Sequence, residues 1–397
     1  MKTVVSVLGR FHAFDLAREL HAQEALEHLF TSYPGSHAAR FGVPADRVTA
    51  MPWNEALNRG SQRLERRTGG RLDLRAWPCA AHDRSVARLL RPGADVFVGW
   101  SGSTLASLAR ARELGMLACV ERGSTHILHQ RDLLAAEYER WGLAGRLPDA
   151  RVVERELAEY ELADRIVVPT EHVASTFVRR GVPRERLLQV PYGVSLDAFR
   201  APATPREANS PFVLMHCGNV SLRKGCHYLV DAFLRLRLPG ARLVFVGPVS
   251  EELQAFLADR LPHAGGSIEL VGRVPQAELV QHYERASAFA LASLEEGLAM
   301  VLPQAMATGL PVLATRESGA AELIRPGEEG LLVPARDVDA LADGIERLYR
   351  DRDASLAMGA RAAARVATGF SWKDYGRRVA EAYAGALDPL SPVRKCA

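Results

Sequence analysis

The sequence predicts an α/β protein of two doubly wound domains, each a parallel sheet flanked by helices. Three observations support this: apolar runs alternate with helical stretches in the first half, a polar break follows, and a second series repeats the pattern. We expect strands of the first series at 3–8, 95–100, 116–121, 166–169 and 187–191. We expect strands of the second series at 212–217, 242–247, 268–271, 288–292, 311–314 and 330–333.

The break, RAPATPREANSP at 200–211, has the composition of a linker. It divides the chain into a first domain over 1–200 and a second over 201–370. Ser371 is a suitable N-cap for a last helix over 371–387.

The segment LASLEEGLAMVLPQAMATGLPVLAT at 291–315 reads as a strand, an acidic pair, a short helix and another strand. Pro303 is comfortable only in a first helical turn, so the helix should start no earlier than about Met300. The amides of 297–300 would then be free to face an anion. Gly309 suits the left-handed residue that ends such a helix. The alternative interpretation is that these residues only form the turns and helix ends that any strand–helix–strand unit needs.

A βαβ unit at 212–248 carries the basic loop Arg223-Lys224-Gly225 after its first strand. Open α/β sheets bind ligands at this edge. The chain has only four lysines, Lys2, Lys224, Lys373 and Lys395, so a lysine here indicates a phosphate contact more than a chance surface charge.

Composition excludes several classes of protein. No apolar run approaches the ~18 residues of a membrane span, and a net charge of +3 is too small to indicate nucleic-acid binding. The five cysteines form no Cys-x-x-Cys pair, which favours a reducing cytoplasm and argues against a structural metal.

With these segments together, the chain resembles the family 4 retaining glycosyltransferases of the GT-B architecture. GNVSLRKG at 218–225 is similar to the family's phosphate-binding loop, and SLEEGLAMVLPQAMATGLPVLAT at 293–315 to its acidic donor motif. The segments 164–199, 268–293 and 370–383 also fit, so the resemblance covers nearly all of 160–385 and is weaker over 1–150. The resemblance implies that the last helix returns to the first domain, which holds the acceptor.

The resemblance also implies the site residues. Catalytic roles fall to Glu296, Lys224, Arg223 and His126. Donor-binding roles fall to Gly9, Arg10, Gly218, Asn219, Arg122, Arg273, Val274, Gly297, Leu298, Ala299, Met300 and Gln304. Glu296 should touch the donor sugar, and position 304 should hold the ribose hydroxyls.

Two residues depart from the family's pattern. Gln304 stands where the family has Glu, and an amide accepts through one oxygen where a carboxylate accepts through two. We expect position 304 to bind the ribose hydroxyls of the nucleotide more weakly, or to bind a different group. Asn219 stands where many relatives carry Arg, a charge that Arg223 could supply.

The first domain offers two candidate loops. Gly9, Arg10 and His12 follow the first strand, although a plain turn is the favoured interpretation there. The loop VERGSTHILHQ at 120–130 offers Arg122 and His126 equally as sugar contacts, with helix capping or a salt bridge as the alternative.

Nine arginines lie within 59–91, near Trp53 and Trp77: Arg59, Arg63, Arg66, Arg67, Arg71, Arg75, Arg84, Arg88 and Arg91. This stretch could make peripheral contact with an anionic membrane or a phosphate-bearing acceptor. A solvated arginine-rich face is slightly favoured.

The sequence and its resemblance therefore imply a cytoplasmic, retaining, metal-independent hexosyltransferase with no cofactor. We expect the sequence to lack an Asp-x-Asp metal pair of the kind that other glycosyltransferases use. The donor would be a UDP- or GDP-linked sugar and the acceptor a sugar or lipid-linked glycan, in glycan, polysaccharide or glycolipid biosynthesis. The alternatives are a sugar phosphorylase or epimerase on the same fold and a non-catalytic family member.

Overall fold

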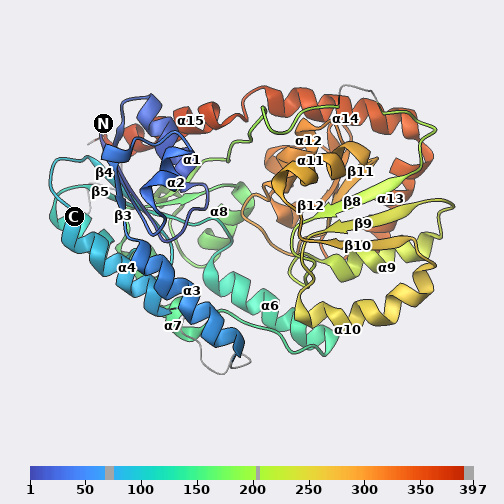
Figure 1. Ribbon diagram of the computed structural model, residues 1–397, viewed down its shortest axis with the longest axis horizontal. Helices are drawn as coiled ribbons and strands as arrows, with labels where there is room; N and C mark the ends of the chain where they lie inside the picture. Colours follow the sequence, from blue (N-terminus) through green and yellow to red (C-terminus); the bar gives the residue numbers. More distant parts are fainter. Residues whose placement is uncertain (68–75, 203–205, 389–397) are drawn as a thin grey trace.

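The computed structural model describes residues 1–67, 76–202 and 206–388 and contains two all-parallel sheets (Figure 1). The first sheet has the order β3-β2-β1-β4-β5-β6-β7. Its strands are β1 Thr3–Val7, β2 Leu26–Thr31, β3 Val48–Ala50, β4 Val96–Trp100, β5 Leu117–Glu121, β6 Arg165–Val168 and β7 Leu187–Gln189. Its helices are α1 Ala13–Ala22, α2 Gly35–Ala39, α3 Pro52–Arg67, α4 Ala76–Leu89, α5 Leu105–Glu113, α6 Ile127–Trp141, α7 Ala150–Leu162 and α8 Glu171–Val178.

The second sheet has the order β10-β9-β8-β11-β12-β13. Its strands are β8 Val213–Cys217, β9 Arg242–Val246, β10 Ile268–Gly272, β11 Ala288–Leu291, β12 Val312–Thr315 and β13 Gly330–Val333. The helices of this half are α9 Cys226–Leu236, α10 Glu251–Arg260, α11 Gln276–Arg285, α12 Val301–Ala307, α13 Val338–Arg350, α14 Arg352–Ala367 and α15 Trp372–Leu387.

The predicted α/β fold with two doubly wound sheets is confirmed. Every predicted strand is present, with both ends within two residues of the prediction. The prediction missed β2 and β3 at one edge of the first sheet. The short β3 is only half-buried and β2 carries Glu27 and His28, so neither has the continuous apolar run that marks a strand buried on both faces.

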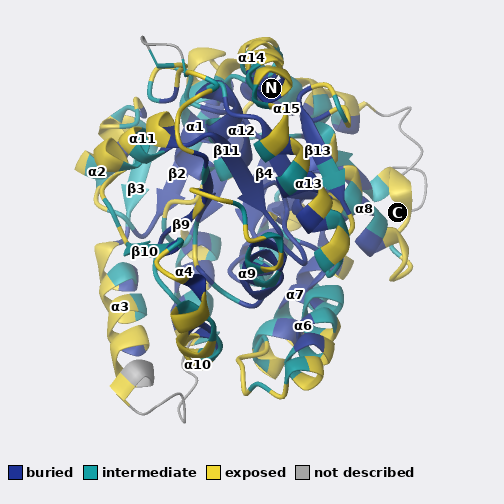
Figure 2. Ribbon diagram, turned by 90° about the vertical axis from the view of Figure 1, so that its right-hand side faces the viewer, coloured by how far each residue is buried: buried dark blue, intermediate teal, exposed yellow. Residues whose placement is uncertain are grey.

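Both sheets are buried beneath helices (Figure 2). One apolar core is confined to the first domain around Phe97 and Ile166, and another lies mainly in the second around Leu243 and Phe245. A third core runs through both domains and includes Tyr375. The domains therefore share apolar packing as well as a linker.

Two helices join the domains. The last helix, α15, begins with the expected Ser371 N-cap and packs so closely on α1 that a Cβ on Gly376 would lie 2.3 Å from the Cβ of Glu19. On the opposite side, α6 leaves the first domain and reaches α9 (Figure 1). There Glu137 of α6 accepts hydrogen bonds from Tyr228 (2.5 Å) and Arg336 (2.5 Å).

Candidate active site

The basic loop and the acidic loop meet at one point of the second sheet. Its strand order reverses between β8 and β11, the switch point where open α/β sheets leave a crevice at their carboxyl ends. The loop 218–225 follows β8, and the loop 292–297 follows β11. A Cβ on Gly225, which has φ +62°, would lie 1.9 Å from the carbonyl oxygen of Ala292. The glycine therefore lets the two loops touch.

This contact brings the predicted charged residues together. Lys224 Nζ donates to Glu296 Oε1, and Ser293 Oγ donates to the same oxygen at 3.2 Å. Arg223 Nη2 lies 3.5 Å from Glu296 Oε2, while its Nε donates to Glu295. Two cations and two carboxylates thus form one half-buried network, in which each charge has a partner.

Glu295 links this network to the first domain. Its fully buried carboxylate accepts from Ser124 (2.8 Å), Thr125 (2.8 Å) and Gln130 (2.7 Å) as well as from Arg223. Burial alone would raise the pKa of Glu295. The Arg223 charge and these hydrogen bonds outweigh burial and lower the pKa to about 2. The sequence marked Glu295 only as half of an acidic pair, because its partners come from distant loops.

The carboxyl edges of the two sheets face each other at this junction. A Cβ on Gly297 would lie 2.2 Å from the carbonyl oxygen of Gly123, so the first domain approaches the backbone closely at this glycine. The expectation of free amides over 297–300 is corrected in part, because the Ala299 amide donates to the Ser318 carbonyl at 3.4 Å. The amides of Gly297, Leu298 and Met300 donate to no group among the described residues.

The short helix α12 matches its prediction. It starts at Val301 with Met300 as N-cap, Pro303 lies in its first turn, and Gly309 follows it with φ +75°. Tyr283 donates from its hydroxyl to Gln304 Oε1 at 3.3 Å.

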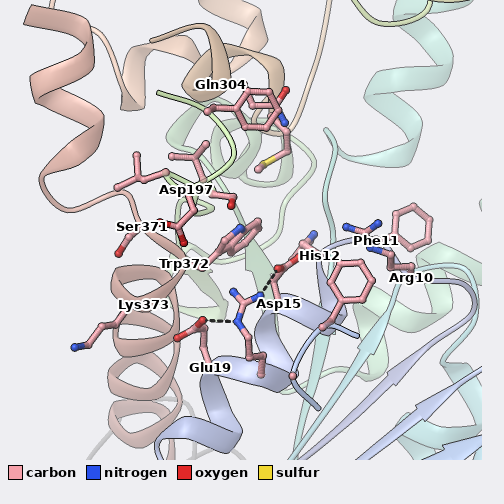
Figure 3. A pocket seen from close by; sticks show the side chains of 18 of the residues that line it. Arg10, Phe11, His12, Asp15, Glu19, Asp197, Gln304, Ser371, Trp372 and Lys373 are labelled. Atoms are coloured by element: carbon pink, nitrogen blue, oxygen red, sulfur yellow. Dashed lines mark hydrogen bonds and ion pairs between the residues drawn. The ribbon is translucent and has the colours of Figure 1, made fainter. Parts of the chain in front are cut away.

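A cleft of about 1,090 Å³ opens between the domains beside α12. Gln304 lies across it from Arg10 and His12 (Figure 3). The cleft also contains Met300 and Gln276 from the second domain. The structure therefore places Arg10, Met300 and Gln304 in one cavity, whereas Lys224, Arg223 and Glu296 do not line it.

The two candidates of the 120–130 loop have structural partners. His126 is the N-cap of α6, accepting from the Leu128 amide at 3.2 Å, and its ring packs against Tyr160 and Phe177. Burial and the nearby Arg122 charge lower the His126 pKa to about 4. His126 therefore has the capping role that the sequence left open, and its catalytic role stays a prediction.

Arg122 has the salt-bridged role that the sequence left open. It is buried, with Glu156 Oε2 at 2.9 Å and Gln130 Oε1 at 3.1 Å. Burial opposes its charge, but Glu156 raises the Arg122 pKa. A contact between Arg122 and a donor stays a prediction.

The remaining predicted residues lie in loops around the junction. Gly9 (φ +97°) and Gly218 (φ +127°) both need the left-handed backbone that glycine allows, which supports their expected places in tight loops after β1 and β8. Asn219 and Arg273 are exposed, and Val274 is half-buried against the core that the domains share. Their contacts with a donor stay predictions.

The expectation that the sequence lacks an Asp-x-Asp pair is corrected, because it contains two, Asp337 with Asp339 and Asp351 with Asp353. Asp337 caps α13 and Asp351 caps α14, each accepting from the amide three residues later. Over residues 1–67, 76–202 and 206–388, no three His, Cys, Asp or Glu side chains are grouped so that they could hold a metal ion.

The arginine-rich stretch forms parts of α3 and α4. Trp53 and Trp77 are 54% and 65% exposed. Arg71, Arg75 and the side chain of Arg66 lie outside the described part of the chain. No helix in that part is long and apolar enough to cross a bilayer.

Comparison with known proteins places the chain among sugar-transferring enzymes. Residues 211–351 match the family model "Glycosyl transferases group 1". A D-inositol 3-phosphate glycosyltransferase of Xylanimonas cellulosilytica is 31% identical over 323 residues, which are 76% of this chain and 76% of that protein. A GDP-mannose-dependent alpha-(1-6)-phosphatidylinositol monomannoside mannosyltransferase of Mycobacterium tuberculosis is 32% identical over 59% of this chain, and the match spans 65% of that enzyme's length.

Solved structures agree on the fold. The Anabaena protein HepE in complex with UDP has a TM-score of 0.69 at 14% identity, covering 97% of this chain and 100% of that one. A sucrose-phosphate synthase of Thermosynechococcus elongatus has a TM-score of 0.67 at 18% identity, covering 97% and 99%.

Proposed function

We propose, because the chain belongs to the group 1 glycosyltransferases of family 4 and has their GT-B fold, that it transfers a sugar from a nucleotide-diphosphate sugar to an acceptor hydroxyl. The observation that carries this proposal is the meeting of Arg223, Lys224 and Glu296 at the switch point of the second sheet. A leaving diphosphate needs positive charge beside it, and a sugar needs a hydrogen-bond acceptor for its hydroxyls.

The ion pairs suggest how donor binding would work. In the structure Lys224 donates to Glu296. An arriving diphosphate would take Lys224 and Arg223 as partners, and Glu296 would then be free to accept from the sugar. We infer that the site suits a ligand bearing both a diphosphate and a sugar, since phosphate alone would leave Glu296 with Ser293 but without a cation.

We propose a retaining and metal-independent reaction. Arg223, Lys224 and the amides of Gly297, Leu298 and Met300 would stabilise the charge of the leaving diphosphate. The departing phosphate oxygen would take the acceptor proton as the new bond forms on the same face of the sugar, because no carboxylate is assigned as a nucleophile.

The donor and acceptor classes follow from the relatives. We propose UDP- or GDP-linked hexoses as donors, supported by HepE, solved with UDP, and by the GDP-mannose-dependent relative. We propose an inositol or lipid-linked acceptor, as the names of both relatives indicate. Contact of α3 and α4 with an anionic membrane surface would bring a lipid acceptor to the cleft.

The first experiment is a thermal-shift screen with UDP, GDP, ADP, CMP and TDP, since a ligand that binds only the folded state raises the melting temperature. The sugar donors of the nucleotide that binds are then tested for transfer to D-inositol 3-phosphate and to phosphatidylinositol vesicles. NMR of the product reports whether the anomeric configuration is retained. No shift with any nucleotide would contradict the proposed function.

A further inference from the structure

A histidine that lines the cleft forms a pair with a buried glutamate, and the reaction described above uses neither. His12, in the loop after β1, lies with Nε2 3.1 Å from Oε1 of Glu121, the last residue of β5. Glu121 is 1% exposed, and the hydroxyl of Tyr192 lies 3.4 Å from the same oxygen. The His12 ring packs between Tyr192 (centroids 4.1 Å apart) and Trp100 (5.0 Å). This packing fixes the ring in place.

The pair also fixes which ring nitrogen is free. An ionised carboxylate only accepts hydrogen bonds, so Glu121 keeps the proton of neutral His12 on Nε2. Nδ1 is then a bare acceptor. Among the described residues Nδ1 has no partner, and it is not one of the unpartnered side-chain atoms that are sealed from solvent. Since His12 lines the cleft, a ligand in the cleft can reach Nδ1.

The position of the pair matches that of the donor cluster in the other sheet. The first sheet reverses its strand order between β1 and β4, and His12 lies over the ends of β1, β4 and β5. Two residues beyond Glu121, the carbonyl of Gly123 meets Gly297, next to Glu296. The His12 pair therefore belongs to the first-domain wall of the junction where the sugar would be transferred.

We propose that His12 is a catalytic residue whose Nδ1 accepts a hydrogen bond from the attacking hydroxyl of the acceptor, and that Glu121 is a positioning residue that fixes the His12 tautomer. This inference rests on the proposed function. The hydrogen bond orients the oxygen lone pair toward the sugar carbon, and the proton still leaves with the departing phosphate.

Two substitutions separate this role from a purely structural one. His12→Asn places an amide where Nδ1 lies and loses the partner of Glu121. His12→Gln places an amide where Nε2 lies, so it keeps the bond to Glu121 and loses the acceptor in the cleft. We expect His12→Gln to melt at a higher temperature than His12→Asn. We expect His12→Gln nevertheless to transfer sugar about tenfold more slowly than His12→Asn, because one lost hydrogen bond to the reacting hydroxyl usually has that effect on a rate. Both variants should bind the nucleotide found in the screen as tightly as wild type.

The matched control is His28, whose Nε2 lies 2.7 Å from Thr49 Oγ1 at the distant edge of the first sheet. His28→Asn and His28→Gln should transfer at equal rates. Transfer rates at position 12 that follow the melting temperatures, with Gln above Asn, would overturn the inference and leave the proposed function intact. Absence of transfer by wild type with every donor tested would overturn both.

Discussion

At the scale of single residues, Gln304 is the clearest departure from the family. Its Oε1 already accepts from Tyr283, so its amide nitrogen is left to face the cleft. A nitrogen donor cannot accept from ribose hydroxyls. We expect Gln304→Glu to tighten nucleotide diphosphate binding by ~1 kcal/mol, because a charge-assisted hydrogen bond replaces a neutral one.

Calorimetry with UDP and GDP measures this change. Gln276→Glu is the control, since it adds the same charge to the same cleft at another position. Weaker binding of both nucleotides by Gln304→Glu would mean that the site is built around an amide and that the carboxylate lacks a partner.

A second prediction at the scale of single residues concerns the side chain of Lys224. We expect Lys224→Ala to lower the transfer rate about a hundredfold, because losing one group that stabilises a leaving charge raises the barrier by ~3 kcal/mol. Steady-state kinetics measures the effect. Lys2→Ala, which removes a surface lysine that donates to the Glu24 carbonyl, should leave the rate unchanged. A Lys224→Ala rate within threefold of wild type would remove Lys224 from the site.

At the scale of elements, the loop after β11 is held to the first domain through Glu295. The folded-state pKa of about 2 lies below the ordinary value of 4.5, so this carboxylate stabilises the fold above pH 4.5. That stabilisation is lost as the pH falls from 4.5 toward 2. We expect Glu295→Gln to lower the free energy of unfolding at pH 7 by on the order of 2 kcal/mol, because a neutral amide leaves Arg223 poorly paired.

Urea unfolding at several pH values between 2 and 7 tests this. The difference between wild type and Glu295→Gln should shrink steadily below pH 4.5. Glu278→Gln, at an exposed position in α11, should follow wild type throughout. A difference that is constant with pH would show that the Glu295 charge does not stabilise the fold.

The sequence predicted the positions of helices and strands better than it predicted the partners of single side chains. Buried parallel strands are continuous apolar runs, so β8 and β11 could be located, and Pro303 located the start of α12. The strands β2 and β3, at one edge of the first sheet, lack that signal. The partners of Glu295 and Glu121 lie between 71 and 171 residues away along the chain, so only the folded sheets bring them together. Neither the Glu295 network nor the His12 pair has a local pattern from which it could have been predicted.

At the scale of the whole molecule, the two domains are joined on both sides of the junction. On one side α15 packs on α1, and on the other Glu137 of α6 bonds to Tyr228 and Arg336. Between them, the carbonyl of Gly123 leaves room for nothing but a glycine at 297. The loop after β11 and the loop after β5 therefore already touch across the junction.

The ion pairs at the junction also bear on metals. Arg223 and Lys224 are held at the switch point by Glu295 and Glu296, so positive charge for a diphosphate is present in the protein itself. The first aspartate of each Asp-x-Asp pair caps a helix. We expect EDTA to leave the transfer rate unchanged, and added Mg²⁺ or Mn²⁺ to leave it unchanged as well, because the protein's own cations stabilise the leaving group. Transfer by wild type before and after chelation measures this. An enzyme that EDTA inactivates and Mg²⁺ or Mn²⁺ restores would assign that stabilisation to a metal ion and leave Lys224 and Arg223 as partners of the two glutamates alone.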